Sequence, residues 1–203
     1  TMQALFVHGM GRSPLSGWPL LQQLRKAGLK TGSFSYLVSL EPFATIQARL
    51  AKQIADIAHH DEYVLIGHSL GGVLIRAALT SLPPDIRQPS HVFLLGSPVK
   101  PSRLAQRLGT NIAFRMLTRD CGKLLASEER MSQFGAVSPP TTSIVGTKGI
   151  NWKRWPFNGE QNDGIVALSE VSAEWLTDQI TVPLVHGVLP SSKKVAHIIL
   201  DRL

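Results

Sequence analysis

The segment Gly67-His68-Ser69-Leu70-Gly71 has the residue types and spacing that can make a serine reactive. The run Glu62–Ile66 before it predicts a buried strand, and the run Gly72–Leu79 after it predicts a helix. A serine on a sharp turn between a strand and a helix is a nucleophile elbow. Glycine is needed two positions before and after, because side chains there would collide with the strand or the helix. We therefore expect Ser69 to be a nucleophile.

A serine hydroxyl needs a base that takes its proton, and that base needs a carboxylate that orients it. In elbow enzymes the base is a histidine late in the chain, on a loop after a strand. His186 follows the predicted strand Gln179–Val182 and fits this place. His91 opens a strand, and His197 lies in an amphipathic helical pattern where we expect a packing role. His186 is thus the predicted base.

The predicted acid is Asp163, in the segment Asn162-Asp163-Gly164-Ile165-Val166. It lies between the predicted strand Thr142–Gly146 and His186, and Gly164 permits a tight turn that presents the carboxylate. An Asp-Gly pair is also an ordinary turn signal. The competing carboxylates are Asp120, Glu160, Glu170, Glu174 and Asp178.

Two backbone N–H groups are needed to hold the oxyanion that forms during acyl transfer. We expect one from Leu70, directly after the nucleophile. The other is expected from Met10, because Gly9 and Gly11 let that turn approach the site closely. We expect His8 and His68, which lie at strand ends, to hold loops by hydrogen bonds rather than to act as bases.

Strands and helices alternate along the chain, which indicates an α/β protein with a mostly parallel sheet covered by helices on both faces. The predicted strands are Gln3–Val7, Gly32–Tyr36, Tyr63–Ile66, His91–Leu95, Thr142–Gly146 and Gln179–Val182. The predicted helices are Trp18–Ala27, Ile46–His59, Gly72–Leu79 and Ser191–Arg202, with helix-like pieces at Arg103–Leu108 and Ile112–Leu125.

The composition fits a single globular domain over residues 1–203, with 43% hydrophobic and 17% charged residues. A single cysteine, no long apolar run and no signal-like N-terminus favour a cytoplasmic protein, although a secreted protein without its signal peptide would look similar. The net charge of +7 is scattered along the chain, so we expect no nucleic-acid partner. Weak association with an anionic membrane surface stays open, as does a monomer or a weak homo-oligomer.

Taken together, the turn His8-Gly9-Met10-Gly11, the elbow, the Asp163 motif and His186 resemble a small α/β-hydrolase of the bacterial lipase and esterase type. The resemblance covers nearly the whole chain. It implies a core of about six mostly parallel strands without the usual first antiparallel strands, and no metal or organic cofactor. The segment 97–140 is longer than in the smallest lipases, and it is either a cap or lid insertion or extra packing helices.

The expected activity is that of a serine hydrolase that cleaves a small-molecule or lipid carboxylic ester through an acyl-enzyme intermediate. A thioesterase, an acyltransferase or a phospholipase would use the same three side chains, since pocket contacts set specificity. A peptidase or a non-catalytic binding module of the same fold are the further alternatives.

Overall fold

All six strands of the protein form one parallel sheet, in a computed structural model that describes residues 1–203. The spatial order is β2-β1-β3-β4-β5-β6, and every neighbouring pair is parallel. The expected six-stranded α/β architecture is confirmed, with parallel pairing throughout. The strands are β1 (Met2–Val7), β2 (Lys30–Phe34), β3 (Glu62–His68), β4 (His91–Leu95), β5 (Thr141–Gly146) and β6 (Asp178–Val182).

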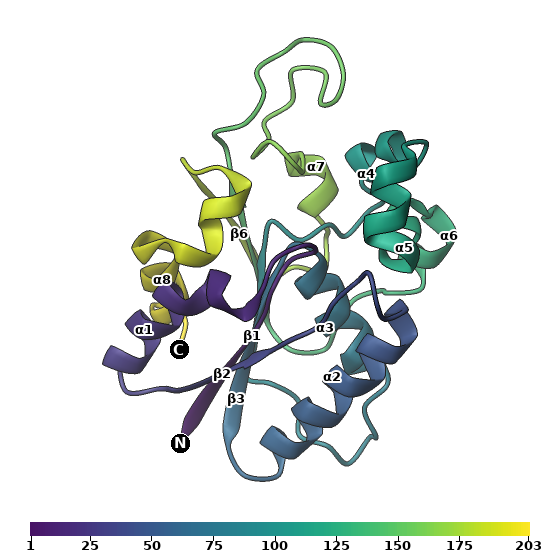
Figure 1. Cartoon of the computed structure of the whole chain (residues 1–203). Helices are drawn as coiled ribbons and strands as arrows, with labels where there is room; N and C mark the ends of the chain where they lie inside the picture. Colours follow the sequence, from purple (N-terminus) through teal and green to yellow (C-terminus); the bar gives the residue numbers. More distant parts are fainter.

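Helices cover both faces of this sheet (Figure 1). One face carries α1 (Trp18–Lys26) and α8 (Lys193–Leu200), and the other carries α2 (Phe43–Ala58) and α3 (Leu70–Thr80). Side chains alternate across a strand, so Val64 and Ile66 pack against α1 and α8, whereas Leu65 between them packs against α2 and α3. The two resulting cores bury the sheet on both sides, as a parallel sheet requires.

Helical periodicity explains how α2 lies on the sheet. Its buried residues are Phe43, Ile46, Leu50, Ile54, Ile57 and Ala58, which recur at three- and four-residue spacing on one stripe. The helix starts three residues earlier than the sequence pattern predicted. Its first turn is fixed by a long-range contact, in which the backbone N–H of Phe43 donates to Asp120 at 2.9 Å.

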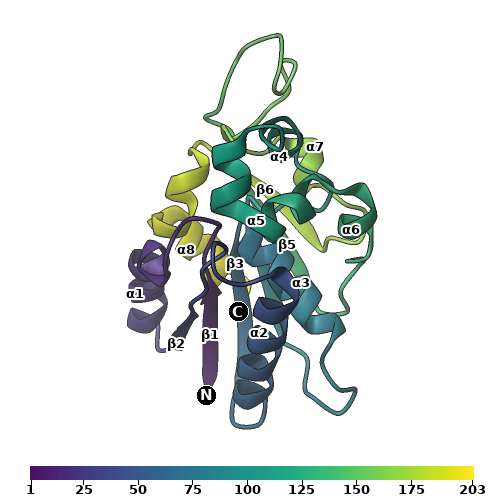
Figure 2. The same cartoon turned by 45° about the vertical axis from the view of Figure 1, so that its right-hand side comes forward.

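Three helices follow β4 and lie on the same side of the sheet as α2 and α3: α4 (Arg103–Leu108), α5 (Ile112–Ala126) and α6 (Glu128–Ser132) (Figures 1 and 2). The second half of α5 joins the large core through Cys121, Leu124 and Leu125. The segment after α6 is tied down by Arg76 of α3, whose guanidinium donates to the carbonyls of Phe134 and Gly135. This guanidinium is buried, and burial lowers the pKa of Arg76 to about 10.

The remaining elements are short. They are the 3-10 helices η1 (Pro14–Gly17) and η2 (His186–Ser191) and the single-turn helix α7 (Leu168–Val171). The expectation that His197 packs into the core is wrong: it lies on the exposed side of α8, because Val195, Ala196 and Ile199 form the buried stripe. None of the helices combines the length and the hydropathy that a membrane-spanning helix needs.

Candidate active site

Ser69 is one of three non-glycine residues with positive φ, at φ 54° and ψ −121°. It stands between the end of β3 and the first residue of α3, where the sequence predicted an elbow. Such a backbone conformation costs on the order of 1–3 kcal/mol for a residue with a side chain. The surrounding contacts must supply that energy, and they hold the serine side chain at the carboxyl edge of the sheet.

The glycines around Ser69 allow the sharp turn. A Cβ atom on Gly67 would lie 2.5 Å from the backbone of Gly72, and one on Gly71 would collide with the carbonyl of Val7. The third glycine, Gly72, lies against the side chain of Ser97. The turn therefore packs directly on β1 and on the segment after β4, without room for any side chain at these positions.

His186 and Asp163 meet at the same edge, from the segments after β6 and β5. The Nδ1 atom of His186 lies 2.7 Å from Oδ2 of Asp163, and both residues are buried. A second contact links their backbones, since the N–H of His186 donates to the carbonyl of Asp163 at 3.0 Å. The two residues are thus fixed to each other through side chain and main chain alike.

The turn around Asp163 explains why its carboxylate is rigid. Its Oδ1 atom accepts hydrogen bonds from the N–H groups of Ile165 and Val166, each at 2.9 Å, which leaves Oδ2 for His186. Gly164, at φ 99°, makes the turn possible. This arrangement can hold the imidazole in one tautomer, with Nδ1 as the donor and Nε2 free for chemistry.

The three side chains do not form a continuous hydrogen-bonded chain. The Ser69 hydroxyl makes no hydrogen bond to His186. The residue before it, His68, does contact His186, with the two ring centroids 4.7 Å apart. Catalytic hydrogen bonds are often long or poorly aligned in the free enzyme. The structure thus brings Ser69, His186 and Asp163 to one edge and joins the last two directly.

The N–H groups of Met10 and Leu70 are both free of protein acceptors. Leu70 is the first residue of α3, where an N–H has no partner within the helix and the helix dipole favours negative charge. Gly9 places the Met10 turn against the elbow, since a Cβ there would lie 3.4 Å from the Cβ of Ser69. Both N–H groups thus lack an acceptor within the protein, and their role as oxyanion donors stays a prediction.

The two histidines at strand ends hold loops. The His8 ring stacks on Tyr36 at 4.2 Å, and the Tyr36 hydroxyl donates to the His8 carbonyl at 2.7 Å. The Nε2 atom of His68 lies 3.0 Å from the carbonyl oxygen of His186. Burial lowers the pKa of both rings, and that of His68 well below its usual value. His68 is therefore neutral at pH 7 and donates from Nε2 to the backbone of His186.

Four of the five competing carboxylates form ion pairs elsewhere, and the fifth, Glu174, is exposed. Glu160 and Glu170 both pair with Arg103, at 2.7 Å and 3.0 Å. Asp120 pairs with Arg130, and Asp178 with Arg202. Each of these four carboxylates is paired with an arginine, and none of them contacts His186.

Three residues near the site were missed by the sequence reasoning. Gly96, at φ 53°, leaves the space that the acid and base occupy, because a Cβ there would lie 2.9 Å from Nδ1 of His186. Arg12 donates to the carbonyl of Gly187 at 2.7 Å and so links the Met10 turn to the His186 loop. Asn162 bonds the carbonyls of Ile150 and Glu160. Only Gly96 left a local signal, a glycine directly after a strand.

Comparison with solved structures identifies the architecture. No family model matches the chain, and no curated protein matches it in sequence. Solved structures match over almost all of it. A lipase from Bacillus licheniformis, BlEst2, superposes with a TM-score of 0.78 and 18% identity, covering 98% of this chain and 49% of the lipase. The chain therefore spans about half the length of that protein.

Two further structures share the architecture. The RedJ thioesterase of the prodiginine pathway of Streptomyces coelicolor has a TM-score of 0.65 and 15% identity, covering 100% of this chain and 86% of its own. The phospholipase PlaB from Legionella pneumophila has a TM-score of 0.66 and 16% identity, covering 85% of this chain and 46% of its own. The chain has the α/β-hydrolase fold. At these identities the likeness establishes the fold, and function rests on the site.

Proposed function

We propose that the protein is a serine hydrolase that cleaves carboxylic esters. The observation that carries the proposal is the 2.7 Å contact between His186 and Asp163 at the edge where the strained Ser69 elbow lies. A strained backbone at an otherwise unsuitable residue is retained where function needs it. A buried carboxylate that orients a histidine is the partner such a serine requires.

The proposed reaction gives each of these residues one role. Nε2 of His186 takes the proton of the Ser69 hydroxyl as Oγ attacks the ester carbonyl carbon, and Asp163 stabilises the imidazolium that forms. The tetrahedral oxyanion accepts hydrogen bonds from the N–H groups of Met10 and Leu70. His186 then gives its proton to the leaving alkoxide, which departs as the alcohol. The acyl group remains on Ser69.

Water completes the cycle by the same route. His186 deprotonates a water molecule that attacks the acyl-enzyme carbonyl, and the same two N–H groups hold the second oxyanion. Collapse of that intermediate breaks the bond to Oγ of Ser69, which regains its proton from His186. The carboxylic acid leaves, and the enzyme is restored.

The proposed substrates are esters of short or medium acyl chains. A thioester or a phospholipid ester presents the same carbonyl, and the fold is shared with proteins described as a thioesterase and a phospholipase. Transfer to an acceptor alcohol would need only that the alcohol replace water. Contacts around the acyl and leaving groups separate these reactions, since the triad chemistry is common to them.

The test is a panel of p-nitrophenyl esters from acetate to palmitate, with an acyl thioester and a phospholipid as comparison substrates. We expect the highest kcat/KM on a short or medium ester, with Ser69→Ala inactive. Aminoacyl anilides, included as peptidase substrates, should not be cleaved. Failure to turn over any ester by a folded protein would contradict the proposal.

A further inference from the structure

The first half of α5 carries apolar side chains that face solvent. Ile112, Met116 and Leu117 are 71%, 64% and 67% exposed, whereas the second half of the same helix is buried in the core. A helix of a globular protein normally turns its apolar stripe inward. In α5 one set of apolar side chains faces the core and a second set, Ile112, Met116 and Leu117, faces solvent. No other part of the chain covers this second set.

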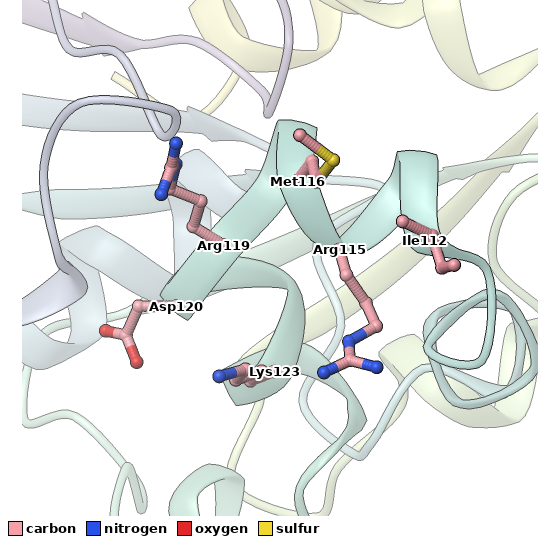
Figure 3. A pocket seen from close by; sticks show the side chains of 6 residues that line it. All are labelled: Ile112, Arg115, Met116, Arg119, Asp120 and Lys123. Carbon is pink, nitrogen blue, oxygen red and sulfur yellow. The ribbon is translucent and has the colours of Figure 1, made fainter.

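Three cations share a cavity with two of these apolar side chains, Ile112 and Met116. Arg115, Arg119 and Lys123 recur every four residues on α5 and line a shallow cavity of about 410 Å³ together with Ile112, Met116 and Asp120 (Figure 3). None of the three cations forms a salt bridge within the protein. Asp120, the one carboxylate in the cavity, is already held by Arg130 and by the N–H of Phe43. The cavity therefore has an uncompensated positive charge.

Large apolar side chains are also exposed in the loop that follows the carboxyl end of β5, where Trp152 and Trp155 are 66% and 48% exposed. Figures 1 and 2 both show the loop 147–161 projecting at this end, beyond α4 and α5.

Two adjacent basic residues lie between two tryptophans on that loop. Lys153 and Arg154 stand between Trp152 and Trp155, and all four are exposed. The guanidinium carbon of Arg107 in α4 lies 5.9 Å from the centroid of the Trp155 ring, and this contact links the loop to α4. These exposed side chains of α5 and of the loop together form a surface that we call the basic apolar face. It consists of Ile112, Arg115, Met116, Leu117, Arg119, Lys123, Trp152, Lys153, Arg154 and Trp155.

We propose that the basic apolar face docks on an anionic phospholipid bilayer. Lipid phosphates would bind the cations of α5, while Met116, Leu117 and the tryptophans enter the interfacial region of the leaflet. Apolar and cationic groups mixed on one face match a surface that offers hydrocarbon and negative charge together. A nucleic acid would leave Ile112, Met116 and Leu117 exposed, and an apolar protein partner would leave the three cations without counterions.

Docking in this way places the elbow on the lipid side of the molecule. Ser69, His186 and Asp163 lie at the same carboxyl edge as the basic apolar face. Binding itself requires none of these three residues, so it goes beyond the proposed ester hydrolysis and can be tested apart from it. Ser69→Ala should bind vesicles as well as the parent protein does.

The first experiment measures partition onto vesicles of phosphatidylcholine with or without phosphatidylglycerol, at low and high salt. We expect binding to the anionic vesicles only, weakened by salt. The double variant Arg115→Gln and Lys123→Gln should bind about 30-fold more weakly, from roughly 1 kcal/mol per cation near the surface.

The matched control is Lys26→Gln with Lys52→Gln. These lysines are exposed, lie on α1 and α2, and change the net charge by the same amount. Their double variant should bind like the parent. Equal loss in both double variants would show that binding follows net charge alone and would overturn the proposal, as would absence of binding to anionic vesicles.

The apolar part of the face has its own variant, Met116→Ser with Leu117→Ser. Both residues are exposed, so the fold should be retained, which a thermal melt checks. We expect partition to fall by about tenfold or more, because two side chains no longer enter the leaflet. Unchanged partition in this variant would contradict insertion of α5.

Discussion

Ser69 combines an unfavourable backbone conformation with the proposed chemistry. Glycine adopts positive φ without the steric cost that a Cβ brings, so stability alone would favour glycine at this position. The protein instead keeps a serine and packs Gly67, Gly71 and Gly72 around it. The site is therefore expected to trade stability for reactivity.

Substitutions at Ser69 should show that trade directly. Ser69→Ala retains the Cβ and should leave the free energy of unfolding nearly unchanged, with esterase activity lost. Ser69→Gly should also be inactive but more stable than Ser69→Ala by about 1 kcal/mol, because it relieves the strain. Urea unfolding of the three proteins measures this. Equal stability of the alanine and glycine variants would argue against strain at the elbow.

Asp163 should matter through the tautomer of His186. Asp163→Asn keeps the shape of the turn but no longer stabilises the imidazolium, so kcat should fall about 10³- to 10⁴-fold. The matched control is Glu170→Gln, a buried carboxylate paired with Arg103, which should lose stability and keep its kcat. If Glu170→Gln lost kcat as Asp163→Asn does, the acid would be assigned wrongly.

At this scale the sequence carries the proposed nucleophile, acid and base because their chain order and glycine spacing are local patterns. Arg12 could not be found in this way. Its contact with Gly187 joins residues 175 positions apart, and no spacing rule foretells it. The structure was needed for the same reason to show that Glu160 and Glu170 are bound to Arg103.

Among the elements, α5 departs most from regular geometry. Arg119 has φ 45° and ψ −127°, a non-helical conformation between the exposed and the buried halves of the helix. On one side of the break the first half exposes Ile112, Met116 and Leu117 while Phe114 packs against the core, and on the other side the second half is buried in the core. The break therefore separates the first half of α5, which we propose docks on the bilayer, from the second half, which packs in the core.

Two glycine substitutions on α5 should have opposite effects. Arg119→Gly should stabilise the protein by about 1 kcal/mol, because glycine tolerates positive φ. Arg115→Gly, in regular helix, should destabilise it by about 1 kcal/mol. Thermal or urea unfolding measures both. Destabilisation by Arg119→Gly would mean that the break is not strained.

Elements with clear periodicity were predictable, and the shortest ones were not. The strand His91–Leu95 and the helix Arg103–Leu108 have the predicted bounds. The single turn α7 has too few residues for a period. It is fixed by Glu170, which accepts from the N–H of Ala167 and pairs with Arg103. Such an element depends on tertiary contacts, which a sequence window does not contain.

Over the whole molecule, three buried histidines link stability to pH. Burial lowers the pKa of His8, His68 and His91 below the usual 6.5. Between the folded and the unfolded pKa the unfolded chain binds more protons, so acid favours unfolding. The contribution of these neutral histidines to the free energy of unfolding is complete above pH 6.5. It is lost as the pH falls below 6.5 towards their folded-state pKa values.

We therefore expect the free energy of unfolding to fall from pH 6.5 to 5, by up to about 1.4 kcal/mol per pH unit for each histidine that stays neutral. Urea titrations across this range measure the slope. His68→Gln should make it shallower, whereas His59→Gln, at an exposed position, should not. An identical slope in parent and His68→Gln would contradict the burial argument.

The distribution of exposed apolar groups is also a property of the whole molecule. The sequence contains Trp152, Met116 and Leu117 without showing that they reach the same end as Ser69. Parallel strands bring their carboxyl ends together, and so collect segments far apart in the chain at one edge. A prediction of the fold shows which segments meet at the carboxyl edge of the sheet. Which of their side chains are exposed there depends on tertiary packing.

The central claim, that Ser69 is the nucleophile of a serine hydrolase, is tested most directly by covalent labelling. The folded protein is treated with a fluorophosphonate, digested and examined by mass spectrometry, with Ser69→Ala as the control. We predict one adduct, on the peptide that contains Ser69, and parallel loss of esterase activity. An unlabelled Ser69, or an active Ser69→Ala protein, would contradict the account.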